Sequence, residues 1–137
     1  MAHKNIEIVR RIYERWGLCD FRAGMELYDP HVLLVLRPEF PDAGVYRGLD
    51  EIGKYMREEF LTGFDSAAIS GEEFLSAGDS VVVRVNQQAT GPGSGAPVAM
   101  SYYQIWTFRG KTVIRIESVR ERDDALEAVG LSPTARR

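Results

Sequence analysis

Apolar residues near the start of the chain recur every three or four positions, which is the spacing of one face of a helix. This stripe consists of Ile6, Val9, Tyr13 and Trp16. The spacing predicts a helix over about residues 5–16 that ends near Gly17. A short second helix is predicted over about 21–27, because its apolar residues precede Asp29 and Pro30, which break helices.

The next segment changes from helical spacing to a run of branched apolar residues. Residues 31–37 predict a buried strand, and two prolines that follow predict a loop before a short strand at 45–47. Asp50 is a suitable N-cap for a third helix that ends near Gly63. The apolar face of this helix would consist of Ile52, Tyr55, Met56 and Phe60.

From Ala67 onward, apolar and polar residues alternate with the period of two that is typical of strands. The predicted strands are 67–75, 79–89, 98–108 and 112–121, followed by a helical turn at 123–129. Glycine-containing turns separate these strands and predict antiparallel hairpins. The pattern therefore favours an α+β fold, in which a curved antiparallel sheet packs its helices on one face and closes a cone around an internal apolar pocket.

Composition narrows the picture to an ordinary globular protein. The 137 residues are 45% hydrophobic and 27% charged, which predicts a single domain over 1–137 with an ordered core at about 5–131. The net charge is −3 and no basic block is present, which argues against nucleic acid. No apolar run approaches the roughly 20 residues that span a membrane. Cys19 has no partner for a disulfide, and we expect a cytoplasmic location.

Five stretches of the chain together resemble one known family. They are Tyr13–Gly17 with Asp20, Pro41–Gly48 with Asp50–Ile52, Glu73–Asp79 with Val81–Val83, Ile105–Gly110, and Arg122–Leu131. In these stretches the chain resembles the SnoaL-like polyketide cyclase family, within the nuclear transport factor 2-like superfamily. The resemblance implies a ketosteroid isomerase-like, cone-shaped α+β fold that often forms homodimers. Because superfamily members include isomerases, cyclases, hydrolases and non-catalytic domains, the function must come from the pocket residues.

Strand alternation assigns the side chains of this pocket. With the charged Arg84 facing outward, the inward residues of its strand are Val81, Val83, Val85 and Gln87. By the superfamily pattern, the next strand points Met100, Tyr102, Gln104, Trp106 and Phe108 inward. The same logic assigns inward positions to Leu33, Val35, Arg37, Ile116, Ser118 and Arg120.

The resemblance also implies where catalytic groups would lie. The usual general base falls at Val35, the second polar group at Gln104, and a helix-borne tyrosine at Ile12. A slip of one residue would place Leu34 or Leu36 at the base position instead. Neither valine nor leucine has a proton to exchange, and an amide only orients or donates a hydrogen bond, so isomerisation by the usual arrangement is not expected.

Several side chains remain as candidates for the site. The expected ligand-binding residues are Tyr13, Trp16, Val35, Tyr55, Gln87, Tyr102, Trp106, Ser118 and Arg120. Gln104 would polarise a carbonyl or orient a water, and Glu39 or Asp42 would act as base if their loop folds inward. The alternatives are a structural hydrogen-bond network for the glutamines and solvated carboxylates for the loop. His3 and His31 have no ligands at metal spacing, and no metal or other cofactor is expected.

The outer face of the predicted sheet carries apolar residues as well. Tyr103, Ile105 and Val119 lie there among charged residues, which predicts a homodimer through this face. Three functions stay open: an isomerase, cyclase or hydrolase for a small apolar or aromatic, oxygen-bearing substrate; a non-catalytic binding module for such a ligand; and a dimerisation module whose cone is filled by its own side chains.

Overall fold

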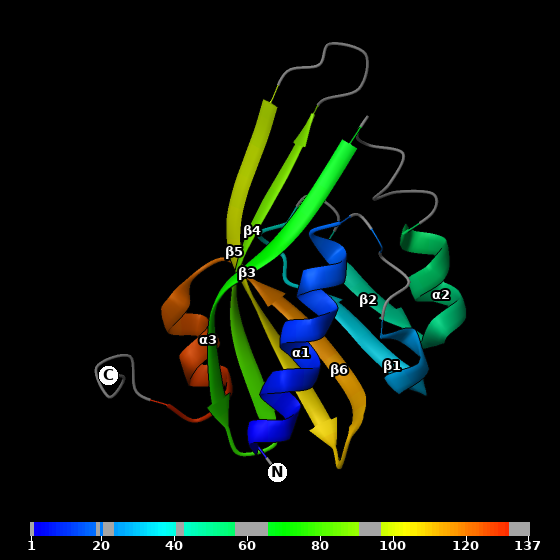
Figure 1. The fold of residues 1–137 in the computed structure, drawn as a ribbon, viewed down its shortest axis with the longest axis vertical. Coiled ribbons are helices and arrows are strands. Elements are labelled where there is room, and N and C mark those ends of the chain that lie inside the picture. Colours follow the sequence, from blue (N-terminus) through cyan, green and yellow to red (C-terminus); the bar gives the residue numbers. More distant parts are fainter. Residues whose placement is uncertain are drawn as a thin grey trace.

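A computed structural model gives the structure of the chain and describes residues 2–18, 20, 24–40, 43–56, 66–90 and 97–131. Three α-helices and one short 3₁₀ helix surround one sheet of six strands (Figure 1). The helices are α1 (Ala2–Trp16), η1 (Met25–Leu27), α2 (Gly48–Tyr55) and α3 (Arg122–Ala128). The strands are β1 (Tyr28–Leu36), β2 (Gly44–Arg47), β3 (Ser66–Ala77), β4 (Ser80–Thr90), β5 (Pro97–Arg109) and β6 (Thr112–Val119).

The strand order across the sheet is β2-β1-β6-β5-β4-β3. The predicted hairpins are confirmed, since β3 to β6 form an antiparallel meander and β1 pairs antiparallel with β2. However, β1 pairs with β6 in parallel, so the sheet is mixed and not wholly antiparallel as predicted. Alternation shows which face a residue occupies but not the direction of the neighbouring strand. Strand β6, the last of the meander, runs parallel to β1. No hairpin turn joins these two strands, so the local sequence gives no signal for the direction of their pairing.

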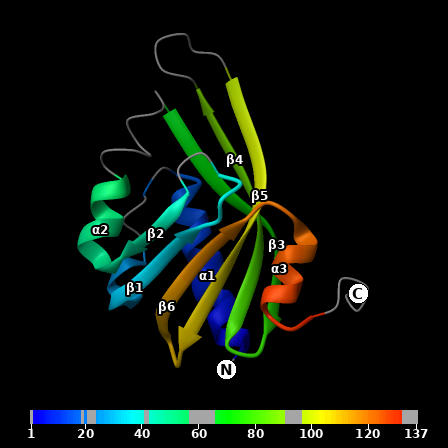
Figure 2. The same cartoon turned by 180° about the vertical axis from the view of Figure 1, so that it is seen from behind.

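The helices lie on both faces of the sheet. Helix α1 packs against β3 and β4 on the inner face, and α2 packs against β1 and β2. Helix α3 lies on the opposite face, which is clearest when the molecule is seen from behind (Figure 2). The predicted packing of the N-terminal helices on one face is confirmed for α1 and α2, whereas the predicted terminal turn forms α3 on the other face.

Two predicted helices differ from those observed. The described part of the second helix is only the 3₁₀ turn η1, which follows Gly24 in a left-handed conformation. Helix α2 begins at Gly48, and its N-cap residue is Arg47 and not Asp50. The backbone N–H of Arg47 donates to Oε1 of Glu51 at 2.7 Å, so a side chain inside the helix satisfies its first donor. The predicted continuation to Gly63 lies outside the described residues.

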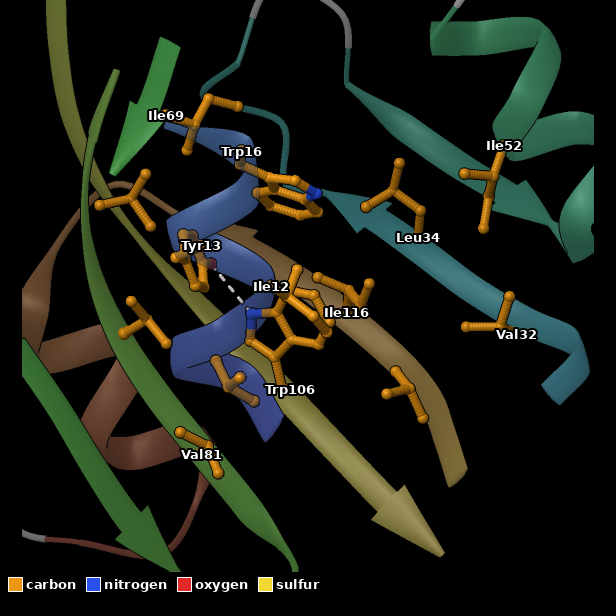
Figure 3. Close-up of a cluster of buried hydrophobic side chains, with 14 of the residues drawn as sticks. Ile12, Tyr13, Trp16, Val32, Leu34, Ile52, Ile69, Val81, Trp106 and Ile116 are labelled. Carbon is orange, nitrogen blue, oxygen red and sulfur yellow. Dashed lines mark hydrogen bonds between the residues drawn. The ribbon is translucent and has the colours of Figure 1, made fainter. Parts of the chain in front are cut away.

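The main core lies between α1, α2 and the inner face of the sheet. The predicted stripe of α1 is confirmed, since Val9, Tyr13 and Trp16 are all buried. On β1, by contrast, Val32 and Leu34 point into the core, as Figure 3 shows. The predicted inward orientation of Leu33, Val35 and Arg37 is wrong by one residue. Five consecutive apolar residues in β1 give no alternation, so its sequence could not set the register.

A second, smaller core lies under α3 on the outer face. Ala125 of α3 is fully buried there with Val82, Ile105 and Val119, and Leu126 of the same helix is fully buried as well. Ile105 and Val119 were expected to meet a partner chain, but a helix of the same chain covers them. The C-terminal helix thus accounts for much of the apolar character of this face.

Candidate functional site

The inner face of β4 and β5 carries the polar side chains of the candidate site. All four predicted inward residues of β4 are buried, as are Tyr102, Gln104, Trp106 and Phe108 of β5. Across the ladder, Gln104 lies opposite Val83 and Ser118, and Tyr102 lies opposite Val85. The inward orientation predicted for these two strands is therefore confirmed.

A chain of hydrogen bonds crosses this face from α1 to β6. Nε1 of Trp106 donates to the hydroxyl of Tyr13 at 2.9 Å, as the dashed line in Figure 3 shows. That hydroxyl donates to Oε1 of Gln104, and Nε2 of Gln104 donates to Oγ of Ser118 at 3.3 Å. The chain links three secondary-structure elements inside an otherwise apolar core.

Elementary hydrogen-bond chemistry fixes the direction of this chain. An indole N–H can only donate, so the Tyr13 oxygen must accept from Trp106, and its own proton then goes to Gln104. The amide oxygen of Gln104 is therefore turned toward Tyr13, which leaves the NH₂ group for Ser118 and for whatever else approaches. One of the two amide protons is used by Ser118.

A second tyrosine–glutamine pair repeats this arrangement further along β4. The hydroxyl of Tyr102 donates to Oε1 of Gln87 at 2.9 Å. Phe40, from the segment after β1, packs edge-on against Tyr102 with ring centroids 5.5 Å apart. In both pairs a tyrosine hydroxyl occupies the amide oxygen, so both glutamines keep amide protons for another partner.

The interior is neutral. Burial raises the pKa of Tyr13 well above its ordinary value, although the hydrogen bond from Trp106 opposes this shift. Burial likewise raises the pKa of Tyr28. Among the described residues, the buried polar side chains are Asn5, Gln87, Gln104 and Ser118, with no carboxylate or imidazole. Tyr13 thus stays protonated and acts as a hydrogen-bond donor, not as a base.

The two glutamines are buried but not completely covered. Gln87 and Gln104 each keep 7% of their surface exposed, whereas Val83, Val85 and Trp106 keep none. All five side chains lie on the inner face of the same two strands. The part of this face that keeps some exposure therefore includes the two glutamines together with Tyr102 and the partly buried Met100.

Three aromatic side chains pack together where the hydrogen-bond chain begins, at Trp106 and Tyr13. Trp16 lies 5.0 Å from Tyr13 and 5.6 Å from Trp106, measured between ring centroids. Tyr13 and Trp106 themselves contact edge-to-face at 5.8 Å. These contacts hold the indole and the phenol in the orientation that their hydrogen bond needs.

Three predicted site residues, Val35, Arg120 and Glu39, lie away from these hydrogen bonds. Val35 is on the outer face of β1, opposite Val45 and Glu117. Arg120 is exposed just after β6, and its backbone N–H lies 3.4 Å from Oε2 of Glu39, which is exposed too. Asp42 lies outside the described residues.

Tyr55 is buried on α2, away from the two glutamine pairs. Its ring stacks against Tyr46 of β2 with centroids 4.5 Å apart. Arg37, predicted to point inward, donates to Glu117 at 2.8 Å on the outer face, and this bond raises the pKa of Arg37. The structure thus brings together Tyr13, Gln104, Trp106 and Ser118, and separately Tyr102 and Gln87.

The described residues show neither a metal site nor a membrane-spanning helix. In the described ranges, no three His, Cys, Asp or Glu side chains are grouped as a metal ion would need. The helices within those ranges include none that is long and apolar enough to cross a membrane.

Comparison with known proteins gives matches of sequence and of fold. The sequence profile of the SnoaL-like domain family matches residues 9–116. A search of curated proteins gives no match. Among solved structures, an NTF2-like protein of unknown function from Burkholderia pseudomallei K96243 is similar, with a TM-score of 0.73 and 19% identity over 92% of this chain and 97% of that one.

Two other solved structures share the fold, with similar TM-scores and sequence identities. TerC, co-crystallised with polyporic acid, has a TM-score of 0.72 and 20% identity over 91% of this chain and 96% of that one. A putative SnoaL-like polyketide cyclase from Jannaschia sp. CCS1 has a TM-score of 0.71 and 18% identity over 96% and 95%. At these identities the likeness concerns the fold alone.

The curved, unclosed mixed sheet with α1 across its inner face is thus the cone of the NTF2-like class. Within that class the chain belongs to the SnoaL-like domain family, because the family profile covers most of its length. The resemblance inferred from sequence is confirmed.

Proposed function

We propose that the chain binds an apolar, oxygen-bearing small molecule against the inner face of β4 and β5. The observation that carries this proposal is that a tyrosine hydroxyl occupies each amide oxygen of the partly accessible Gln87 and Gln104, so that amide protons remain for another partner. A buried amide proton without an acceptor costs about 1–3 kcal/mol, which a ligand oxygen would recover. Carbonyl and ether oxygens are the groups that accept hydrogen bonds from such donors.

The surroundings favour a ligand without charge. The described core holds no buried cation to pair with an anion and no buried carboxylate to pair with a cation. Transfer of an unpaired charge into such an interior is strongly unfavourable. Aromatic side chains around Tyr13 and Tyr102 favour flat, ring-containing ligands.

The family and its structural neighbours are consistent with this class of ligand. The family is named for SnoaL-like domains, and one neighbour is described as a putative polyketide cyclase. TerC, another neighbour, was crystallised with polyporic acid. We take polycyclic ketones, aromatic polyketides, terpenoid epoxides and polyporic acid as the probe set for this chain.

A thermal-shift screen tests the proposal. A probe present at 100 times its dissociation constant stabilises the fold by about 2.7 kcal/mol, which is easily measured. The Gln104→Leu variant should bind the same probe at least about tenfold more weakly, since one buried hydrogen bond is lost. Tyr103→Phe, on the outer face, is the control and should bind normally. Failure of every probe class, or equal binding by Gln104→Leu, would overturn the proposal.

Catalysis on the bound molecule is the second candidate function, as a cofactor-independent isomerase, cyclase or hydrolase. The observation that favours it is the position of Phe40, which is buried against Tyr102 of the second glutamine pair and is the chain neighbour of the exposed Glu39. A base is required, and Glu39 and Asp42 are the carboxylates of this segment. Turnover of a bound probe that survives Glu39→Gln with Asp42→Asn would exclude this assignment.

Assembly and location are proposed on separate grounds. We propose a homodimer through the part of the outer face that α3 leaves open, where Val45 keeps 46% of its surface exposed beside Val35. A sedimentation experiment at micromolar concentration that finds only monomers would contradict it. A cytoplasmic location is proposed because the chain has the single cysteine Cys19.

A further inference from the structure

The hydrogen-bond chain contains one residue whose chemistry permits a single direction. Trp106 is fully buried, and its N–H donates to Tyr13 at 2.9 Å. Tyrosine, glutamine and serine can each donate or accept, so without the indole the Tyr13 proton could turn away from Gln104 and the Tyr13 oxygen could accept from the Gln104 amide instead. The indole removes that freedom, and the oxygen of Gln104 must face the Tyr13 hydroxyl.

Reversal of the Gln104 amide in the native chain would leave two donors facing one oxygen. The amide NH₂ would then meet a Tyr13 oxygen that already accepts from Trp106, and the Tyr13 proton would lose its acceptor. A buried donor without an acceptor is strongly unfavourable. The raised pKa of Tyr13 keeps that proton in place throughout the physiological range.

We propose that Trp106 is a positioning residue that makes the site selective for ligands whose polar atoms only accept hydrogen bonds, namely ketone, quinone or ether oxygens, over the matching alcohols. This inference rests on the proposed function, because it concerns the ligand of the same face. A ketone oxygen accepts from the Gln104 amide and needs nothing further. An alcohol oxygen accepts equally well, but its own proton meets a site where each amide oxygen already accepts a hydrogen bond from Tyr13 or Tyr102 and so attracts a second donor less strongly.

The test measures the ratio of two dissociation constants and not the strength of binding alone. Isothermal titration compares fluorenone with fluorenol, and androstenedione with testosterone. In the native protein the ketone of a pair should bind about tenfold or more tightly than the alcohol. In Trp106→Phe, which keeps an aromatic ring but removes the N–H, Gln104 is free to reverse, and the ratio should fall toward one.

Two variants make the result specific. Tyr13→Phe interrupts the chain at the next residue and should reduce the ratio in the same way, which keeps the test available if Trp106→Phe does not fold. Phe108→Leu perturbs another buried aromatic of β5 without touching a hydrogen bond, so its ratio should stay native even where its stability falls. A merely structural role for Trp106 would weaken ketone and alcohol equally.

The outcomes separate this inference from the proposed function. If none of these four probes and no member of the wider probe set binds, the proposed function fails. If probes bind but the native protein does not distinguish ketone from alcohol, or if Trp106→Phe and Tyr13→Phe keep the native ratio, binding stands and the positioning role is overturned.

Discussion

Replacement of Tyr13 by phenylalanine removes one oxygen atom and interrupts the buried chain at its centre. The Trp106 N–H loses its acceptor, and Oε1 of Gln104 loses its donor. The phenyl ring keeps its contacts with Trp16 and Trp106, so no large cavity is created. The change therefore isolates the polar contribution of the hydroxyl.

The magnitude follows from the number of groups left without partners. The Trp106 side chain is fully buried, and an unsatisfied donor in such a place costs about 1–3 kcal/mol. The Gln104 oxygen adds about 1 kcal/mol, because this residue keeps some exposure and its bond to Ser118. We expect Tyr13→Phe to lower the free energy of unfolding by about 3 kcal/mol, or about 10 °C in Tm for a chain of this size.

Urea denaturation followed by circular dichroism measures this change. Tyr103→Phe is a matched control, because the described structure shows no hydrogen bond for the Tyr103 hydroxyl; it should change stability by less than about 0.5 kcal/mol. A loss for Tyr13→Phe no greater than that of the control would refute the reasoning, since the chain of hydrogen bonds would then contribute nothing to stability.

Three further predictions concern pH and packing. Burial raises the pKa of Tyr13 and Tyr28 in the folded protein, so the unfolded chain loses these protons first as the pH rises. The free energy of unfolding, measured with urea, should therefore fall above about pH 10 by up to about 1.4 kcal/mol per pH unit for each tyrosine. Tyr13→Phe should show a shallower fall, and a slope identical to that of the native protein would contradict this. Gly71→Ala should cost about 1–3 kcal/mol in urea titration, since its Cβ would lie 2.5 Å from Cζ of Phe74; a neutral result would show that the ring can move. Leu126→Ala should cost about 2–5 kcal/mol by the same measurement, because this side chain of α3 is fully buried; a loss below about 1 kcal/mol would mean that its burial hardly contributes to stability.

Local patterns predicted the fold where hydrophobic period and turn chemistry agree. The strands within residues 67–121 alternate over much of their length and are separated by glycine turns, and the structure confirms both the strands and the inward faces of β4 and β5. The first strand lacked that information, because an unbroken apolar run has no polar face, and its register was wrong. The parallel pairing of β1 with β6 depends on contacts between distant segments, which no local pattern records.

The sequence predicted most residues of the candidate site but not the hydrogen bonds between them. Sequence reasoning placed Gln87, Gln104 and Ser118 inward and noted that buried glutamines need partners. It did not pair Gln104 with Tyr13, which lies 91 positions earlier in the chain. The helical spacing of Tyr13 was the available signal, since it placed a hydroxyl on the buried side of α1. The order of the hydrogen bonds from Trp106 to Ser118 could not be predicted, because it depends on how α1 packs on the sheet.

The same lack of long-range information explains the error on the outer face. Ile105 and Val119 are apolar on the side of the sheet away from α1, and a partner chain would cover them equally well. The predicted terminal turn at 123–129 gave the helix that does so, but not its position.

The most direct test of ligand binding at the inner face follows the side-chain amide signals of Gln87 and Gln104 by nuclear magnetic resonance. Signals assigned with Gln87→Leu and Gln104→Leu are observed while the strongest probe of the screen is added. The account predicts that both amide NH₂ signals move as the probe saturates and that the signal of the exposed Gln88 does not. Saturable binding that leaves the Gln87 and Gln104 amides unmoved would place the ligand elsewhere and contradict the account.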